Sequence, residues 1–97
     1  MQIISFGKLK EFFETNPAVT VPMQDWFKRV TKAEWDNFSD LKTTFNSVDS
    51  MGNQMYVFNV QNHYRIVAKV MFTLKRIYIR WVGNNKDYSR IKFIENL

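Results

Sequence analysis

A two-residue alternation of apolar and polar side chains between Asn53 and Tyr88 constrains the fold of this chain more than any other feature. Alternation with a period of two is typical of strands that bury one face. Three runs show it, and turn-forming segments separate them: 55–60, 64–70 and 77–82. The sequence therefore predicts three consecutive antiparallel strands, joined by hairpin loops at 61–63 and 72–75.

The register of these strands follows from placing the more apolar set of each run against one core. This placement pairs Phe58 with Ile66 and Ala68 with Ile79. A slip of one residue in either hairpin would bury charged side chains, so we expect only this register. The set predicted to face the core is Tyr56, Phe58, Val60, Tyr64, Ile66, Ala68, Val70, Ile77, Ile79 and Trp81.

The opposite face of the predicted sheet carries several cations. In the expected register Asn59 lies beside Arg65, and Arg65 lies opposite Val82 and diagonal to Arg80. Between residues 55 and 81 the sequence has five Lys or Arg and no Asp or Glu. The cations on this face therefore lack a carboxylate from the same strands with which to pair.

Lys69 is expected opposite Tyr78 on the same face. A solvated outer face is the simpler interpretation of such cations, and it fits the two at 75–76, which lie at a loop. It is less convincing for Arg65, Lys69 and Arg80, because they cluster beside aromatic and amide side chains. The cluster indicates a site that binds an anion.

Length and composition limit the possible functions. With 97 residues the chain is expected to form one domain over 1–97, and its 45% hydrophobic and 16% aromatic content is not that of a disordered chain. The absence of cysteine and the single histidine predict neither a disulfide framework nor a metal site, and nothing indicates a cofactor. A net charge of +5 favours a polyanionic partner.

The N-terminal segment MQIISFGKLKEFF is too interrupted by charge to be a signal peptide or a membrane span. A cytoplasmic protein with no membrane contact is therefore expected.

The rest of the chain predicts helices around this sheet. Residues 2–4 indicate a short strand, 6–15 a helix, and a second helix begins near 21–22. The segment 35–45 fits either a short helix or an ordered loop. Residues 84–90 indicate a turn leading into a short helix, and the final residues are expected to fray. The predicted class is α+β, with two N-terminal helices packed on one face of a mainly antiparallel sheet and a short C-terminal helix.

Several motifs in order resemble the HigB-type toxins of bacterial type II toxin–antitoxin modules, within the broader RelE/ParE-like group. The motifs span nearly the whole chain: MQIISFGKLKEFFETNP, W-F-K-R-V followed by A-E-W, N-F-S-D-L-K, G-N-Q-M-Y-V-F-N-V, Y-R-I-V, and I-Y-I-R-W-V-G followed by D-Y. The resemblance implies a metal-independent endoribonuclease that cuts mRNA, often on translating ribosomes. It also implies a helix-turn-helix antitoxin, similar to HigA, as partner.

The resemblance assigns roles to several cations. Arg65 in Y-R-I-V matches the strand arginine of the RelE-like group and is expected at the scissile phosphate, where a guanidinium can hold two oxygens. Arg80 is expected to share that role or to hold a neighbouring phosphate. Lys69 and Lys86 are candidates for contacts with the RNA backbone.

Tyr88 matches the family tyrosine after the last strand, and the resemblance implies base stacking or orientation of the 2′-hydroxyl. Many relatives have Thr-His after V-G, whereas this chain has Asn84-Asn85. An amide at Asn85 cannot act as a general acid or base. His63, in a predicted hairpin loop, is an alternative proton carrier or else an idle exposed side chain.

Three further polar side chains are candidates for RNA binding. Asn53 and Asn59 fall on family motif positions and can donate amide hydrogens, although Asn53 is also an ordinary turn residue after Gly52. Tyr78 flanks the predicted cations. Two functions besides mRNA cleavage stay open: an inhibitor of a protein such as gyrase on the same scaffold, and a decayed toxin that only binds RNA or its antitoxin.

Overall fold

The structure, a computed structural model, describes residues 1–90, and the final residues that the sequence predicts to fray lie outside this part. Its elements in chain order are β1 (Gln2–Ile4), α1 (Phe6–Thr15), the 3₁₀ turn η1 (Pro17–Val19), α2 (Thr20–Lys32), α3 (Phe38–Thr44), β2 (Val48–Gly52), β3 (Met55–Val60), β4 (Tyr64–Met71), β5 (Arg76–Asn84) and α4 (Asn85–Ser89).

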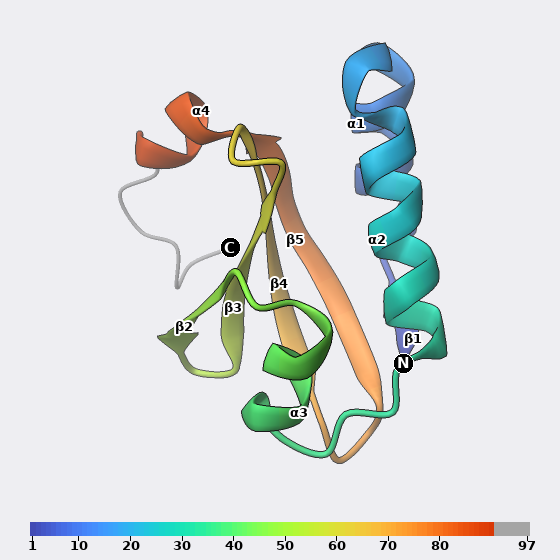
Figure 1. The fold of residues 1–97 in the computed structure, drawn as a ribbon, viewed down its shortest axis with the longest axis vertical. Coiled ribbons are helices and arrows are strands. Elements are labelled where there is room, and N and C mark those ends of the chain that lie inside the picture. Colours follow the sequence, from blue (N-terminus) through green and yellow to red (C-terminus); the bar gives the residue numbers. More distant parts are fainter. Residues whose placement is uncertain (91–97) are drawn as a thin grey trace.

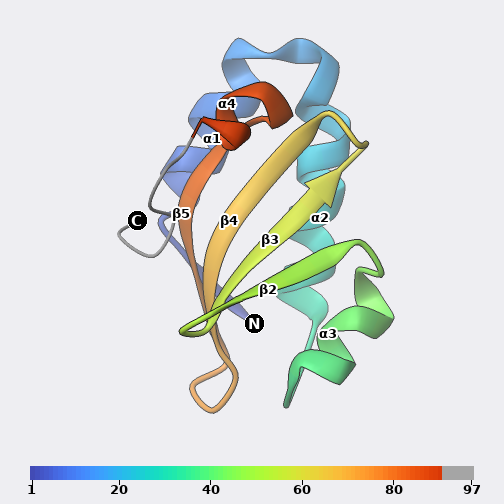
Figure 2. The same cartoon turned by 90° about the vertical axis from the view of Figure 1, so that its left-hand side faces the viewer.

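Within residues 1–90 the strands form one five-stranded sheet in the order β1-β5-β4-β3-β2. The strands from β2 to β5 pair antiparallel, and β1 adds to β5 in parallel. Helices α1 and α2 cover one face of this sheet, and α4 follows the end of β5 beside the loop between β3 and β4 (Figure 1). Figure 2 shows the other face, which we call the outer face, toward the viewer. The α+β prediction is confirmed.

The core lies between the helices and the sheet. Leu9 of α1 and Met23 of α2 are fully buried there, against Phe58 and Ile66 of the central strands. Trp26 packs its ring edge-on against Phe58, with 5.3 Å between the ring centroids. Such aromatic pairs stabilise a core beyond the area that they bury. The apolar residues of α1 and α2 recur at helical spacing, so each helix turns one apolar face toward the sheet.

The predicted pairing of β3 with β4 is confirmed, because Phe58 lies opposite Ile66 and Asn59 opposite Arg65. Ala68 lies opposite Ile79, also as predicted. Beyond that point the prediction for β5 is wrong. A β-bulge between Val67 and Ala68 shifts the register by one residue.

The bulge reverses the faces of the last residues of β5. Val67 pairs with Trp81 and Ile66 with Val82, so Arg80 is the extra residue of the bulge. Trp81 was predicted in the core but packs on the outer face against Val67, whereas Val82 packs against the helix-covered core. Arg65 therefore lies opposite Gly83, not Val82, and it is not diagonal to Arg80.

Two segments that the sequence left undecided or unassigned are regular. The segment 35–45 contains the helix α3, whose N-cap Asn37 accepts a hydrogen bond from the Asp40 amide. Residues 48–52 form the edge strand β2, which the sequence did not predict. No helix within residues 1–90 has the length and the apolar character needed to cross a membrane.

Candidate functional site

The outer face of the sheet is organised in rows that run across the strands, because directly paired residues of antiparallel strands point to the same face. The Arg65 row contains Asn59, Arg65 and Gly83. Next to it lies the Trp81 row, with Asp49, Val57, Val67 and Trp81. The Lys69 row, with Met55, Lys69 and Tyr78, follows toward the other end of the sheet.

The Arg65 row places a guanidinium and an amide side by side. Arg65 is half-buried, and its Nη1 donates a hydrogen bond to the backbone carbonyl of Tyr64 at 3.0 Å. The Asn59 amide donates to the hydroxyl of Ser47 at 2.6 Å. Both side chains are therefore held in place, and Arg65 retains further N–H groups that can bind an anion.

The Trp81 row has an apolar centre that the sequence did not predict. Val57 and Val67 are buried there together with Met55, and Trp81 and Tyr88 pack against them. Two carbons of the Trp81 ring lie 2.5 Å from the position that a Cβ on Gly83 would occupy. The indole can lie over Gly83, next to Arg65, only because Gly83 has no side chain.

Tyr88 joins this surface from α4. Its ring centroid is 6.2 Å from that of Trp81, with an angle of 49° between the rings. Burial raises the pKa of Tyr88, the carboxylate of Asp49 raises it further, and the guanidinium of Arg65 lowers it. Tyr88 therefore lies within electrostatic reach of both Asp49 and Arg65, and its hydroxyl stays protonated at neutral pH.

The start of α4 is tied to the loop between β3 and β4. The backbone amide of Asn85 donates a hydrogen bond to the carbonyl of His63 at 2.8 Å. Asn84 caps the helix, because its side-chain oxygen accepts a hydrogen bond from the Asp87 amide at 2.8 Å. His63 and Asn85 thus lie side by side at the end of the sheet where Arg65 is found, and Lys86 is exposed on the adjoining turn of α4.

Lys69 lies too far from Arg65 for the two side chains to form the single cluster that the sequence predicts. Lys69 pairs with Tyr78 as predicted. It is four residues from Arg65 on β4, or about 13 Å along the strand, with the buried Val67 between them. Asn53, in the turn between β2 and β3, has a φ of 52° and lies at the same far end. Arg65 and Lys69 therefore lie at separate places on the outer face.

Arg80 lies apart from Arg65 because of the bulge. Its guanidinium lies over the Tyr78 ring, 5.7 Å from the centroid, and its backbone carbonyl accepts a hydrogen bond from Lys8 of α1. With Lys8 and Glu11 it lines a hollow beside α1. Its Nε is buried without a partner among residues 1–90. The expected pairing of Arg65 and Arg80 at one phosphate thus has no support in the strand register.

Sequence reasoning missed two residues of this surface. Asp49 lies on β2, whose single buried side chain, Val48, gives almost no alternation to detect. Trp81 was assigned to the core because strict alternation continues from Ile79. The glycine two residues after Trp81 was the available signal, since a glycine within a strand often marks close approach of another group.

Comparison with known proteins shows which family the chain is similar to. A model of the HigB toxin family, described as the RelE-like toxic component of a toxin–antitoxin system, matches residues 19–91. The chain is 32% identical over 92 residues to the mRNA interferase toxin HigB of Escherichia coli K12, with 92% of this chain and 88% of the relative covered. The mRNA interferase HigB of Shigella flexneri matches with the same identity and coverage.

Proposed function

The chain belongs to the HigB family of RelE-like toxins, and we propose that its Arg65 row cuts mRNA together with Asp49 and Tyr88. It is the toxin component of a toxin–antitoxin system and an mRNA-cleaving endoribonuclease, with a cognate antitoxin as partner. The observation that carries the proposed site is the packing of Tyr88 against the Trp81 row, which contains Asp49 and lies next to the Arg65 row, within electrostatic reach of both charged groups.

Arg65 binds the scissile phosphate. In metal-independent cleavage the 2′-oxygen attacks the adjacent phosphorus while the bond to the 5′-oxygen breaks, and negative charge builds on the phosphoryl oxygens. A fixed guanidinium stabilises that charge because it stays protonated and offers two parallel N–H groups. The hydrogen bond from Arg65 to the Tyr64 carbonyl holds the side chain in place before RNA binds.

Asp49 and Tyr88 carry out the two proton transfers that the cleavage needs. The Asp49 carboxylate accepts the proton of the attacking 2′-hydroxyl, and the Tyr88 hydroxyl donates a proton to the leaving 5′-oxygen. Arg65, which lowers the pKa of Tyr88, stabilises the phenolate that this transfer leaves. This division of roles requires no histidine, which suits a chain with Asn84-Asn85 where many relatives have Thr-His.

The remaining candidates bind the RNA around this centre. His63, Asn85 and Lys86 lie where α4 meets the hairpin loop, and we assign them contacts with one side of the cut. Lys69 and Tyr78 contact the backbone on the other side, with Asn53 beyond them. Arg80 holds a more distant phosphate. The substrate is mRNA on the translating ribosome in the cytoplasm, and a HigA-like helix-turn-helix antitoxin blocks this surface.

The test is induced expression in bacteria, followed by mapping of new 5′ ends in cellular transcripts. We expect new ends with the wild type, about 100-fold fewer with Arg65→Ala, and a comparable loss with Asp49→Asn. Tyr88→Phe removes the hydroxyl but keeps the ring that packs on Trp81, so it tests proton donation alone.

Arg76→Ala is the matched control. It removes the same charge from an exposed position on β5, opposite Met71 and about 20 Å along the sheet from the Arg65 row. The control should leave cleavage almost unchanged. Equal losses in Arg76→Ala and Arg65→Ala would mean that only bulk charge matters, and growth arrest without new ends would point to a protein target such as gyrase.

A further inference from the structure

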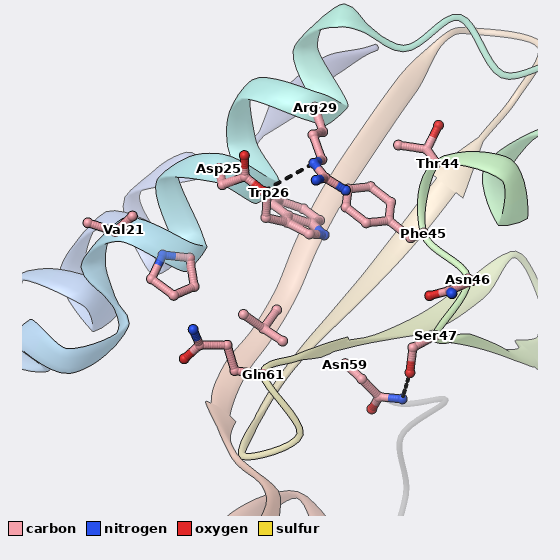
Figure 3. A pocket seen from close by; sticks show the side chains of 12 residues that line it. Val21, Asp25, Trp26, Arg29, Thr44, Phe45, Asn46, Ser47, Asn59 and Gln61 are labelled. Carbon is pink, nitrogen blue, oxygen red and sulfur yellow. Dashed lines mark hydrogen bonds and ion pairs between the residues drawn. The ribbon is translucent and has the colours of Figure 1, made fainter.

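A pocket of about 430 Å³ lies between α2 and the end of β3, next to the candidate site (Figure 3). Trp26 and Arg29 of α2 line one side, and Phe45 and Asn46, which follow α3, line another. Asn59 of β3 and Gln61 of the loop that follows it close the pocket on the remaining side. The volume falls within the range of about 300–1,000 Å³ that is usual for sites binding small molecules.

Trp26 carries a hydrogen-bond donor that this pocket leaves unused. The side chain is only 3% exposed, and its Nε1 has almost no accessible surface and no partner among residues 1–90, so an acceptor reaches it only when a lining side chain moves. In Figure 3 the indole nitrogen points into the pocket. Trp35, which is equally buried, donates its Nε1 hydrogen to Thr44 Oγ1 at 2.9 Å. Since buried donors are nearly always satisfied, the Trp26 N–H indicates a ligand that carries an acceptor.

The charges of the pocket indicate a neutral ligand. Asp25 and Arg29 form an ion pair on α2 with 3.1 Å between carboxylate and guanidinium, and the other lining residues carry no charge. An anion such as phosphate would meet no free cation here. Both partners of this pair are more than half exposed, so the pair is weak and the Arg29 side chain can move aside at small cost.

The remaining groups suit a flat heteroaromatic ring. Phe45 and Trp26 offer aromatic surface, with 6.2 Å between their centroids and 29° between their planes. The amides of Asn46, Asn59 and Gln61 can read both donors and acceptors at the edge of such a ring. Single-stranded RNA is recognised in this way, through stacking and hydrogen bonds to the edge of an unstacked base.

We propose that this pocket binds the base of a nucleotide next to the cleaved phosphate, with the Trp26 N–H donating to a carbonyl oxygen or ring nitrogen of the base. The link to the cut is Asn59, which lines the pocket and lies directly opposite Arg65 in the sheet. The inference rests on the proposed function, because it takes Arg65 as the phosphate-binding group. The pocket then sets which base is preferred beside the cut.

The test uses the whole ¹⁵N-labelled chain and nucleosides, which contain a base but no phosphate. Adenosine, guanosine, cytidine and uridine are titrated separately, and the indole N–H resonances of Trp26 and Trp35 are followed, with Trp26→Phe used for assignment. We expect at least one nucleoside to shift the Trp26 resonance in a saturable way and to leave that of Trp35 in place. Ribose 5-phosphate, which lacks a base, should not shift Trp26.

Gln61→Gly and Asn62→Gly form a matched pair of variants. Both residues have a positive φ, 52° and 62°, which glycine adopts without strain, but only Gln61 lines the pocket. Gln61→Gly should weaken nucleoside binding several-fold and broaden the base preference beside the cut, whereas Asn62→Gly should do neither. Because both positions are exposed loop sites, neither result depends on a change in the core.

The outcomes separate this proposal from the proposed function. Arg65→Ala should still show the nucleoside shift at Trp26, since no phosphate is involved, even though it no longer cuts RNA. Full cleavage by Arg65→Ala would show that the proposed site is wrong, and the nucleoside titration alone would then test the pocket. No shift with any nucleoside, a shift with ribose 5-phosphate alone, or a shift only when antitoxin is added would overturn the base pocket.

Discussion

The two faces of the sheet bury apolar side chains on different scales. On the helix-covered face Leu9, Trp26 and Phe58 belong to a continuous core that fills the space between the helices α1 and α2 and the sheet. On the outer face Val57 and Val67 belong to a small cluster with Trp81 and Tyr88 packed against it. The first core can hold the chain together, whereas the second is too small to do so.

The small cluster has a different role. In the proposed function it forms an apolar floor beside Arg65, Asp49 and Tyr88, and an apolar surrounding strengthens the electrostatic interactions of groups next to it. The comparison therefore assigns stability mainly to one face and chemistry to the other. Three experiments test this division, and they are given from the largest expected effect to the smallest.

Phe58→Ala and Val57→Ala compare neighbouring residues on opposite faces of β3. Phe58 is 1% exposed and packs edge-on against Trp26 and Phe45. Its loss should lower the free energy of unfolding by about 3–5 kcal/mol, whereas Val57→Ala should cost about 2 kcal/mol. Urea denaturation measures both. Equal costs would show that the outer cluster is a second core of the same weight.

Gly83→Ala should disturb the outer face and leave the helix-covered core intact. An added methyl group would lie 2.5 Å from the Trp81 ring, so the indole must move, at a cost of about 1–3 kcal/mol. The Trp81 indole resonance should shift, that of Trp26 should stay, and mRNA cleavage should fall several-fold because Tyr88 packs on Trp81.

Gly7→Ala is the control for this substitution. Gly7 lies in α1, and a Cβ there meets no atom within 4 Å among those that the structure describes. Alanine favours the helix, so this variant should be about 0.5–1 kcal/mol more stable than the wild type. If Gly83→Ala were just as harmless, the close approach of Trp81 to Gly83 would have no consequence for the site.

The same contrast explains which features could be predicted from the sequence. The pairs Phe58–Ile66 and Asn59–Arg65 were predicted because a buried face fixes the register of a hairpin. The bulge at Arg80 was not, because Trp81 is apolar and so continues the alternation of Ile77 and Ile79, although it lies on the other face. The bulge alone moved Trp81 to the outer face and separated Arg80 from Arg65.

The site itself could be predicted only in part. The row of Asn59 and Arg65 follows from the hairpin register, and the family motif made Tyr88 a candidate for base stacking or for orienting the 2′-hydroxyl. The electrostatic effect of Asp49 on Tyr88 depends on how α4 packs at the end of the sheet and on an edge strand that has a weak sequence signal. Such long-range placement is set by tertiary packing and not by local propensity.

The pKa values of Tyr56 and Tyr88 give the finest test of the comparison. Burial raises the pKa of Tyr56, which faces the helix-covered core, whereas burial and Asp49 raise that of Tyr88 and Arg65 lowers it. A carboxylate disfavours the phenolate, so Asp49→Asn should lower the pKa of Tyr88. Arg65→Ala removes a charge that favours the phenolate and should raise it.

Titration of ¹³Cζ-labelled tyrosine measures these pKa values residue by residue, and Asp25→Asn is the control because Asp25 is paired with Arg29 on α2. We expect opposite shifts at Tyr88 in the two outer-face variants, no shift at Tyr56, and no shift at either tyrosine in Asp25→Asn. An unchanged pKa of Tyr88 in Asp49→Asn would remove Asp49 from the site. The proton of the 2′-hydroxyl would then need another acceptor. His63, which lies beside the start of α4, is the remaining candidate proton carrier from the sequence.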